Sequence, residues 1–169
     1  QYSRYLFGQT WSDPLDLEAV PEEIDFEGLN AQILLRKAQL RGIYPLGEKD
    51  LSVSIEDPTP DISGADGISL APDVVAGTRW PLGERGHLQT SVILRYIKGE
   101  TDSIPNRTYS QPAWGVSVSG KVSVRALAED DDIRFALHVG EGFGRYINDL
   151  GAEGGQDAVM DLARDEVRT

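Results

Sequence analysis

Seven segments of the sequence alternate apolar and polar residues with a period of two, and this pattern sets the class of fold. The segments are residues 2–11, 32–44, 51–56, 72–80, 87–97, 113–125 and 132–140. Because successive side chains of a β-strand point to opposite faces, each segment predicts a strand with one apolar and one polar face. In residues 87–97 Ile93 interrupts the polar face formed with Gln89, Ser91 and Arg95. The sequence therefore predicts an all-β, antiparallel chain.

The connections between these segments distinguish two folds that produce such strands. In a soluble sandwich the apolar faces form a core, whereas in an outer-membrane barrel they face lipid and the polar faces line a lumen. Long and short connections alternate here, and the long ones are about 12–31, 57–71, 98–112 and 142–169. This alternation puts every long loop at one end of an up-and-down sheet, as outer-membrane barrels do. Several segments also have the roughly 9–11 residues that a strand needs to cross a bilayer.

Charge is divided unevenly between the strands and the connections. The seven segments hold nine of the 16 basic residues but only three of the 28 acidic residues. If the polar faces line a lumen, their arginines and lysines favour the passage of anions. On a soluble sheet the same side chains are solvated surface charges. The predicted pore-lining and anion-binding residues are Lys37, Arg41, Arg95, Lys121, Arg125 and Arg134.

The first long connection is strongly acidic. Its candidates for a loop that folds inward and constricts the pore are Asp16, Glu22, Glu23 and Asp25. Such a loop, lying beside a cationic wall, would create a transverse field across the narrowest part of the channel. The alternative is a solvated extracellular loop. Near the other end of the chain, we expect residues 155–167 to form one short amphipathic helix within a loop.

Composition excludes several other functions. The formal net charge of −12 argues against binding to a nucleic-acid backbone, and the absence of cysteine excludes disulfide scaffolds and zinc ribbons. Neither histidine lies in a nucleophile motif, so we expect no catalytic residue and no enzyme activity. We also expect no cofactor and no metal site. Two acidic sets, Asp57 with Asp61 and Asp66, and residues 130–132, lack the ligand spacing of a known calcium loop.

Short stretches in order along most of the chain resemble the DcaP-like trimeric porins. The stretches are residues 7–12, 21, 24–26, 28, 36, 39–41, 53–56, 72–76, 114–120 and 140–147. The resemblance implies an outer-membrane channel of Gram-negative bacteria, built as a sixteen-stranded barrel and assembled as a homotrimer. It also implies passive diffusion of small, preferentially anionic solutes such as dicarboxylates. The partners would then be the lipid bilayer, lipopolysaccharide and those solutes.

Seven strands are fewer than such a barrel contains. We therefore expect residues 1–169 to form a single, partial barrel domain, internal to a longer porin. Two alternatives remain at this point. The first is a soluble, secreted or periplasmic β-sandwich that binds carbohydrate or calcium, and the second is a structural β protein such as an appendage subunit. The apolar rows of residues 88–96 and 114–124 separate these alternatives, because they point outward in a membrane barrel and inward in a soluble core.

Overall fold

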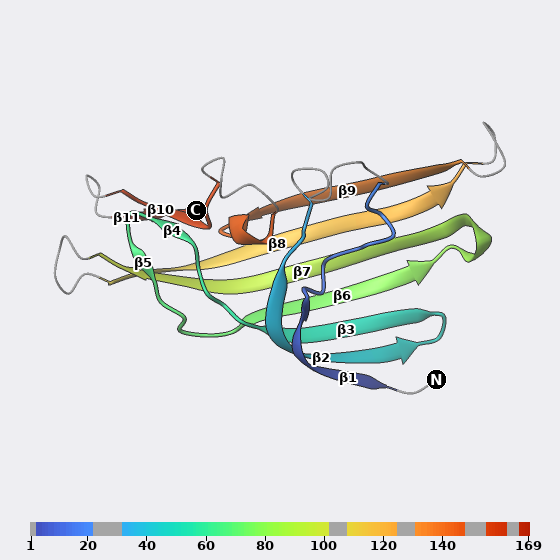
Figure 1. Cartoon of the computed structure of the whole chain (residues 1–169), viewed down its shortest axis with the longest axis horizontal. Coiled ribbons are helices and arrows are strands. Elements are labelled where there is room, and N and C mark those ends of the chain that lie inside the picture. The colour runs from blue at the N-terminus through green and yellow to red at the C-terminus, as the bar shows by residue number, and fades with distance from the viewer. Residues whose placement is uncertain (1–2, 22–31, 102–107, 125–130, 148–154, 162–165) are drawn as a thin grey trace.

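The computed structural model describes residues 3–21, 32–101, 108–124, 131–147, 155–161 and 166–169. All seven predicted segments are strands of one sheet, and each strand pairs antiparallel with its neighbours in chain order (Figure 1). The strands are β1 (Arg4–Trp11), β2 (Arg36–Leu46), β3 (Lys49–Glu56), β6 (Asp73–Pro81), β7 (Gly86–Glu100), β8 (Thr108–Ser123) and β9 (Asp132–Glu141). Across the described residues the sheet is open, with β1 and β9 at its two edges.

The short connections of β2 with β3 and of β6 with β7 lie at one end of the sheet, and the long connections of β1 with β2 and of β3 with β6 lie at the other, as the sequence predicts (Figure 1). The predicted difference in length does not hold for the other two connections, because residues 101–107 between β7 and β8 are no more numerous than residues 124–131 between β8 and β9. The tightest connection is the hairpin between β2 and β3, in which Leu46 pairs with Lys49 and only two residues form the turn. Gly47 adopts a φ of 68° there, a conformation that favours glycine because it has no Cβ. β7 and β8 run further than expected, so they take up both ends of the predicted loop 98–112.

The connections contain small elements that the sequence did not predict. The long connections hold β4 (Ile62–Ser63), β5 (Asp66–Gly67), β10 (Ala158–Asp161), β11 (Glu166–Arg168) and the 3₁₀ turn η2 (Gly144–Tyr146), and the short connection between β6 and β7 holds the 3₁₀ turn η1 (Gly83–Arg85). The helix expected over 155–167 is wrong, because β10 pairs with both β4 and β11. Ala158 is buried against Ile62, so contacts distant in sequence override the local pattern. No helix among the described residues is long and apolar enough to cross a bilayer.

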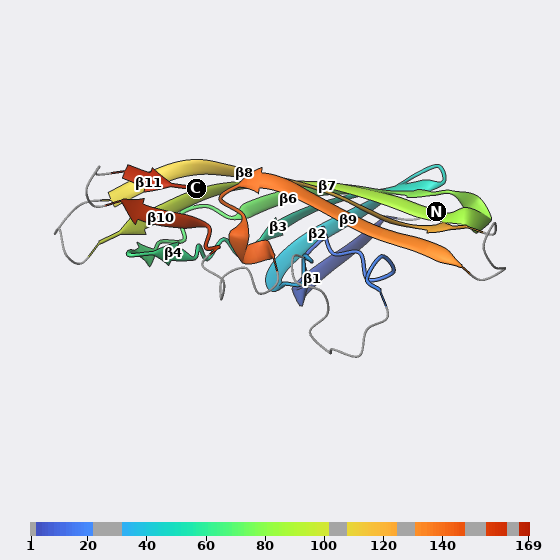
Figure 2. The same cartoon turned by 90° about the horizontal axis from the view of Figure 1, so that it is seen from above.

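The burial of the two faces of the sheet is the reverse of that in a soluble protein, in which the apolar face is buried and the polar face is exposed. On the apolar face the central side chains are exposed: Val53, Ile55, Val74, Val92, Leu94, Val116, Leu137 and Val139. On the polar face the side chains are buried: Lys37, Gln39, Ser54, Glu56, Asp73, His87, Gln89, Ser91, Arg95, Ser117 and Ser119. Figure 2 shows the reason, since residues 12–21 and η2 lie over the concave side of the sheet. The apolar rows therefore point outward, as expected of a membrane barrel.

The packing of Ile93 explains why this apolar residue lies on the polar face of β7. Together with Val75 it forms a small apolar patch on the polar face, packed against Tyr146 and Ile147 of the η2 region. The patch holds the segment after β9 against the sheet. An apolar pair on the polar face thus marks a packing site for a connection.

Candidate functional site: the polar face

Residues 12–21, which we call the strap, lie across the polar face of the sheet. The Ser12 hydroxyl donates to Glu56 Oε2 over 2.6 Å, and the Ser52 hydroxyl donates to Asp13 Oδ2 over 2.6 Å. Arg41 Nε lies 3.1 Å from Asp13 Oδ1. Burial raises the pKa of Asp13, and the positive charge of Arg41 opposes part of that rise. The first residues of the strap are therefore fixed to β2 and β3.

The strap continues over β7, β8 and β9. Asp16 Oδ2 lies 2.7 Å from His87 Nε2 and accepts a 3.0 Å hydrogen bond from the Ser119 hydroxyl. Farther along, Arg134 donates to the carbonyl oxygen of Val20 over 2.9 Å. Asp16 is 5% exposed, so this part of the acidic connection packs against the polar face of the sheet. The other three candidates for the constriction, Glu22, Glu23 and Asp25, lie outside the described residues.

A second set of contacts, which we call the closed cluster, lies where β2, β6 and β7 meet η2. Its members are Lys37, Glu56, Asp73, Arg95, Tyr146 and Asp157. At its centre, Asp73 Oδ2 lies 2.6 Å from Lys37 Nζ and 3.0 Å from Arg95 Nε. Arg95 also lies 2.5 Å from Asp157 and donates to two backbone carbonyls, those of Gly142 and Pro58. Every charge in this cluster thus has an opposite charge or a hydrogen-bond donor beside it.

Tyr146 completes the closed cluster. Its hydroxyl lies 2.9 Å from Asp73 Oδ2 and 3.3 Å from Glu56 Oε2, so the two carboxylates share its single proton as a hydrogen-bond donor. Burial raises the pKa of Tyr146, so the phenol keeps its proton and remains a donor to these carboxylates. Lys37 Nζ also lies 4.1 Å from the centre of its ring, a cation–π contact. One residue of η2 therefore binds both the anions and a cation of the cluster.

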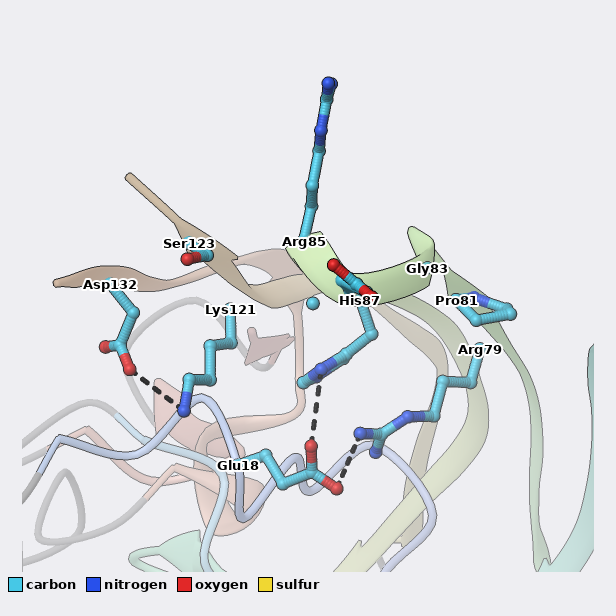
Figure 3. A pocket seen from close by; sticks show the side chains of 11 residues that line it. Glu18, Arg79, Pro81, Gly83, Arg85, His87, Lys121, Ser123 and Asp132 are labelled. Atoms are coloured by element: carbon cyan, nitrogen blue, oxygen red, sulfur yellow. Dashed lines mark ion pairs between the residues drawn. The ribbon is translucent and has the colours of Figure 1, made fainter. Parts of the chain in front are cut away.

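The end of the polar face near the short turns is more open. A cavity of about 550 Å³ there is lined by charged residues of β6, β7, β8 and β9, and we call it the turn-end cavity. Figure 3 shows Glu18 between Arg79 and His87, with Lys121 and Asp132 paired on the opposite side. Arg79 lies 2.8 Å from Glu18, and Lys121 lies 2.9 Å from Asp132. The side chains of Arg79 and Lys121 are 37% and 35% exposed, so water reaches both cations.

The predicted pore-lining residues divide between these regions. Lys37 and Arg95 belong to the closed cluster, while Arg41 is held by the strap. Lys121 lines the turn-end cavity, and Arg134 lies beside it because it shares the carboxylate of Asp132. Arg125 lies outside the described residues.

Sequence reasoning missed several residues that take part in these contacts. The sequence could have indicated the roles of Asp73 and Glu56, because an acidic residue on the polar face of a strand needs a positive charge nearby. Arg79 had the same parity as Asp73, but its contact with Glu18 depends on the path of the strap. Nothing in the sequence connects Asp157 with Arg95 or His87 with Asp16. These last two contacts form only when distant segments fold over the sheet.

Metal ligands do not gather in the described part of the chain. No group of three or more histidine, aspartate or glutamate side chains there is placed to hold a metal ion. Asp57, one member of the first acidic set, instead accepts hydrogen bonds from the backbone and hydroxyl of Thr59. Asp130, in the second set, lies outside the described residues.

Comparison with known proteins identifies the type of sheet. The chain is similar to the outer membrane channel DcaP of Acinetobacter baumannii, with a TM-score of 0.70 and 26% sequence identity. The match covers 82% of this chain and 38% of that channel's chain. No family model matches the chain, and no curated protein matches it. The shared fold is that of an outer-membrane channel, which supports a β-barrel architecture and a location in the bacterial outer membrane for this chain.

Proposed function

We propose that the chain forms part of the wall of an outer-membrane channel through which small hydrophilic solutes diffuse passively. The observation that carries this proposal is the inverted burial of the sheet, with apolar side chains exposed and charged side chains covered. A bilayer solvates the first face, and a water-filled lumen solvates the second. Diffusion down a gradient needs no catalytic residue and no cofactor, so the proposed protein is not an enzyme.

The solutes of this channel are proposed to be small anions, for example dicarboxylates. The support is the distribution of charge on the polar face, where the strands contribute Arg41, Arg79, Lys121 and Arg134. Arginine forks match carboxylates, and cationic rings select anions. Much of the opposing negative charge comes from the strap. Lys37 and Arg95 have a different role in this proposal, because they neutralise buried carboxylates.

The proposed assembly follows from the sequence resemblance. We propose a homotrimer in a membrane that carries lipopolysaccharide, as the DcaP-like porins imply. The exposed apolar face provides surface for both lipid and neighbouring subunits. Chemical cross-linking in intact outer membranes tests this assembly, since a ladder that ends at three subunits is expected. A protein that remains monomeric under the same cross-linking would contradict it.

Reversal potentials across a planar bilayer test the anion preference. The natural protein is inserted under a gradient of potassium chloride, and the preferred ion sets the sign of the potential. The double variant Arg79→Glu with Lys121→Glu reverses two exposed cations and should shift the potential toward potassium by several millivolts to tens of millivolts. The control is Lys49→Glu, because Lys49 lies at a turn against Trp80. A preference for potassium in the natural protein, or an unchanged potential in the double variant, would contradict the proposed selectivity.

A further inference from the structure

A second cavity lies between the strap and the first five strands of the sheet, and we call it the strap cavity. Its volume is about 230 Å³, and it shares Arg79 with the turn-end cavity. The strap contributes Asp13 and Leu15 to its lining, so the cavity exists with the strap in place. Arg4 and Asp50 also line it, and their side chains are 68% and 45% exposed. Water therefore reaches the strap cavity from the polar face.

One buried residue of the strap cavity has an unpaired hydroxyl. Ser91 is 3% exposed, and its Oγ has no hydrogen-bond partner among the described residues. A Cβ built on Gly77 would lie 2.9 Å from this Oγ and 2.9 Å from Asp13 Oδ2. It would also lie 3.1 Å from Ser52 Oγ, so three side-chain oxygens converge on one point beside a residue without a side chain. Because buried polar groups are almost always paired, this arrangement favours a polar ligand atom at that point.

The neighbours of the unpaired hydroxyl indicate which group fits there. Asp13 Oδ2 accepts a hydrogen bond from the Ser52 hydroxyl, and a carboxylate oxygen has room for a second donor. The Ser91 hydroxyl has a proton to donate. A ligand group between Ser91 and Asp13 therefore has to accept one hydrogen bond and donate another. An alcohol hydroxyl does both, whereas a ligand carboxylate would meet the negative charge of Asp13.

The charges of the lining favour a ligand with one negative charge. The lining contains three arginines and two aspartates. Arg4 lies 3.3 Å from Asp50, and Arg41 lies 3.1 Å from Asp13, so both aspartates are paired. Arg79 has no carboxylate partner among the described residues of this lining. One positive charge of the strap cavity is therefore left for a ligand.

The contacts of Arg79 outside the lining leave it able to bind such a ligand. Its Nη2 lies 2.8 Å from Glu18, and its Nη1 lies 3.7 Å from Asp16. The side chain of Glu18 is mostly exposed, so water screens this pair and the pair contributes little to stability. A guanidinium has five N–H groups, and its geometry matches a carboxylate. Arg79 can therefore hold a ligand carboxylate while the strap stays in place.

The size and apolar lining of the strap cavity limit the rest of the ligand. A water molecule takes about 30 Å³ of liquid, so the cavity holds roughly seven groups of that size. Leu15 and Ile43 line it as well and offer contacts to carbon atoms. A short carbon chain that carries one carboxylate and one hydroxyl fits these limits.

We propose that the strap cavity binds a small hydroxy carboxylate, whose carboxylate contacts Arg79 and whose hydroxyl lies between Ser91 and Asp13. Its carbon atoms lie against Leu15 and Ile43, and the strap forms one side of the site without moving. This inference rests on the proposed channel function and names a class of solute that binds to the wall during passage.

Two acids that differ only in the hydroxyl test the site. Saturation-transfer NMR on the natural protein in detergent micelles gives the dissociation constants of lactate and propionate. Lactate should bind on the order of fivefold more tightly, the factor that one hydrogen bond contributes. Equal dissociation constants, or no saturable binding of lactate, would overturn the proposal.

A matched pair of serine variants locates the preference. Ser91→Ala should raise the dissociation constant of lactate on the order of fivefold and leave that of propionate unchanged. Ser117→Ala is the control, because Ser117 is the registered neighbour of Ser91 on β8, is equally buried and contacts His138 instead of the strap cavity. A preference for lactate that survives Ser91→Ala, or that Ser117→Ala abolishes, would overturn the assignment.

Conductance separates this site from the channel function. The same preparation of the natural protein is inserted into a planar bilayer in potassium chloride. A protein that conducts but binds lactate and propionate equally would overturn the site and leave the channel function standing. A protein that prefers lactate but forms no conducting channel would contradict the proposed function and leave the binding site standing.

Discussion

The closed cluster and the turn-end cavity lie on the same face of one sheet and use the same residue types, yet they differ in access to water. The side chains of Lys37 and Arg95 are 3% and 1% exposed, whereas those of Arg79 and Lys121 are 37% and 35% exposed. Removing one partner from a buried ion pair leaves an uncompensated charge, whereas an exposed pair contributes little. On this polar face, burial therefore separates the cations that support the fold from the cations that water reaches.

The largest expected effect breaks the centre of the closed cluster. Asp73→Asn removes the negative charge shared by Lys37, Arg95 and Tyr146, and should lower the free energy of unfolding by about 3–5 kcal/mol. Urea unfolding in phospholipid vesicles, followed by tryptophan fluorescence, measures this loss. The matched change Asp132→Asn, in the turn-end cavity, should cost less than about 1 kcal/mol. Equal losses for the two variants would contradict the distinction between the regions.

A smaller effect is expected from the hydroxyl of Tyr146. Tyr146→Phe removes one donor to two buried carboxylates, and should lower the free energy of unfolding by about 1.5–3 kcal/mol, the contribution of a hydrogen bond to a charged group. Tyr96→Phe is the control, because its exposed hydroxyl contacts only Ser110 in the described structure and should cost less than about 0.5 kcal/mol. The same urea series measures both. If Tyr96→Phe proves the more damaging change, Tyr146 does not support the cluster.

Chemical labelling sharpens the comparison in the folded protein. A water-soluble reagent that acylates amines should modify Lys121 at least about tenfold faster than Lys37, because Lys37 reacts only after local opening. Mass spectrometry of the digested protein gives both rates. Labelling in urea should abolish the difference. A Lys37 that reacts as fast as Lys121 in the folded state would show that the cluster is open.

The smallest effect concerns the pH dependence of the strap. Because burial raises the pKa of Asp13, the folded state holds this proton more readily than the unfolded state. The contribution of Asp13 to stability is therefore fully present below its ordinary pKa of 3.8 and is lost as the pH rises through the raised value. Asp13→Asn should remove this component, so the stability difference between the natural protein and the variant should change with pH above 3.8. A difference that stays constant with pH would contradict the shift.

The sequence predicted the sheet better than the site. Period-two alternation identified all seven main strands, although β3 begins at Lys49, two residues before the predicted segment 51–56. This succeeds because alternation reports a local property of the backbone. The partners of Lys37 and Arg95 depend on where η2 and the segment around Asp157 fold, which the alternation does not determine. The strap was recognised as acidic, but its path across the polar face is set by contacts with β2, β3, β6, β7, β8 and β9.

Cysteine scanning of β7 tests the orientation of the sheet most directly. Single cysteines at residues 91 to 96 of the natural protein are labelled with a fluorophore, and quenching by doxyl-labelled lipid is measured in vesicles. The inverted burial predicts strong quenching at Val92, Leu94 and Tyr96 and weak quenching at Ser91, Ile93 and Arg95. Strong quenching at the second set, or none at either, would contradict the membrane-facing assignment on which the channel proposal depends.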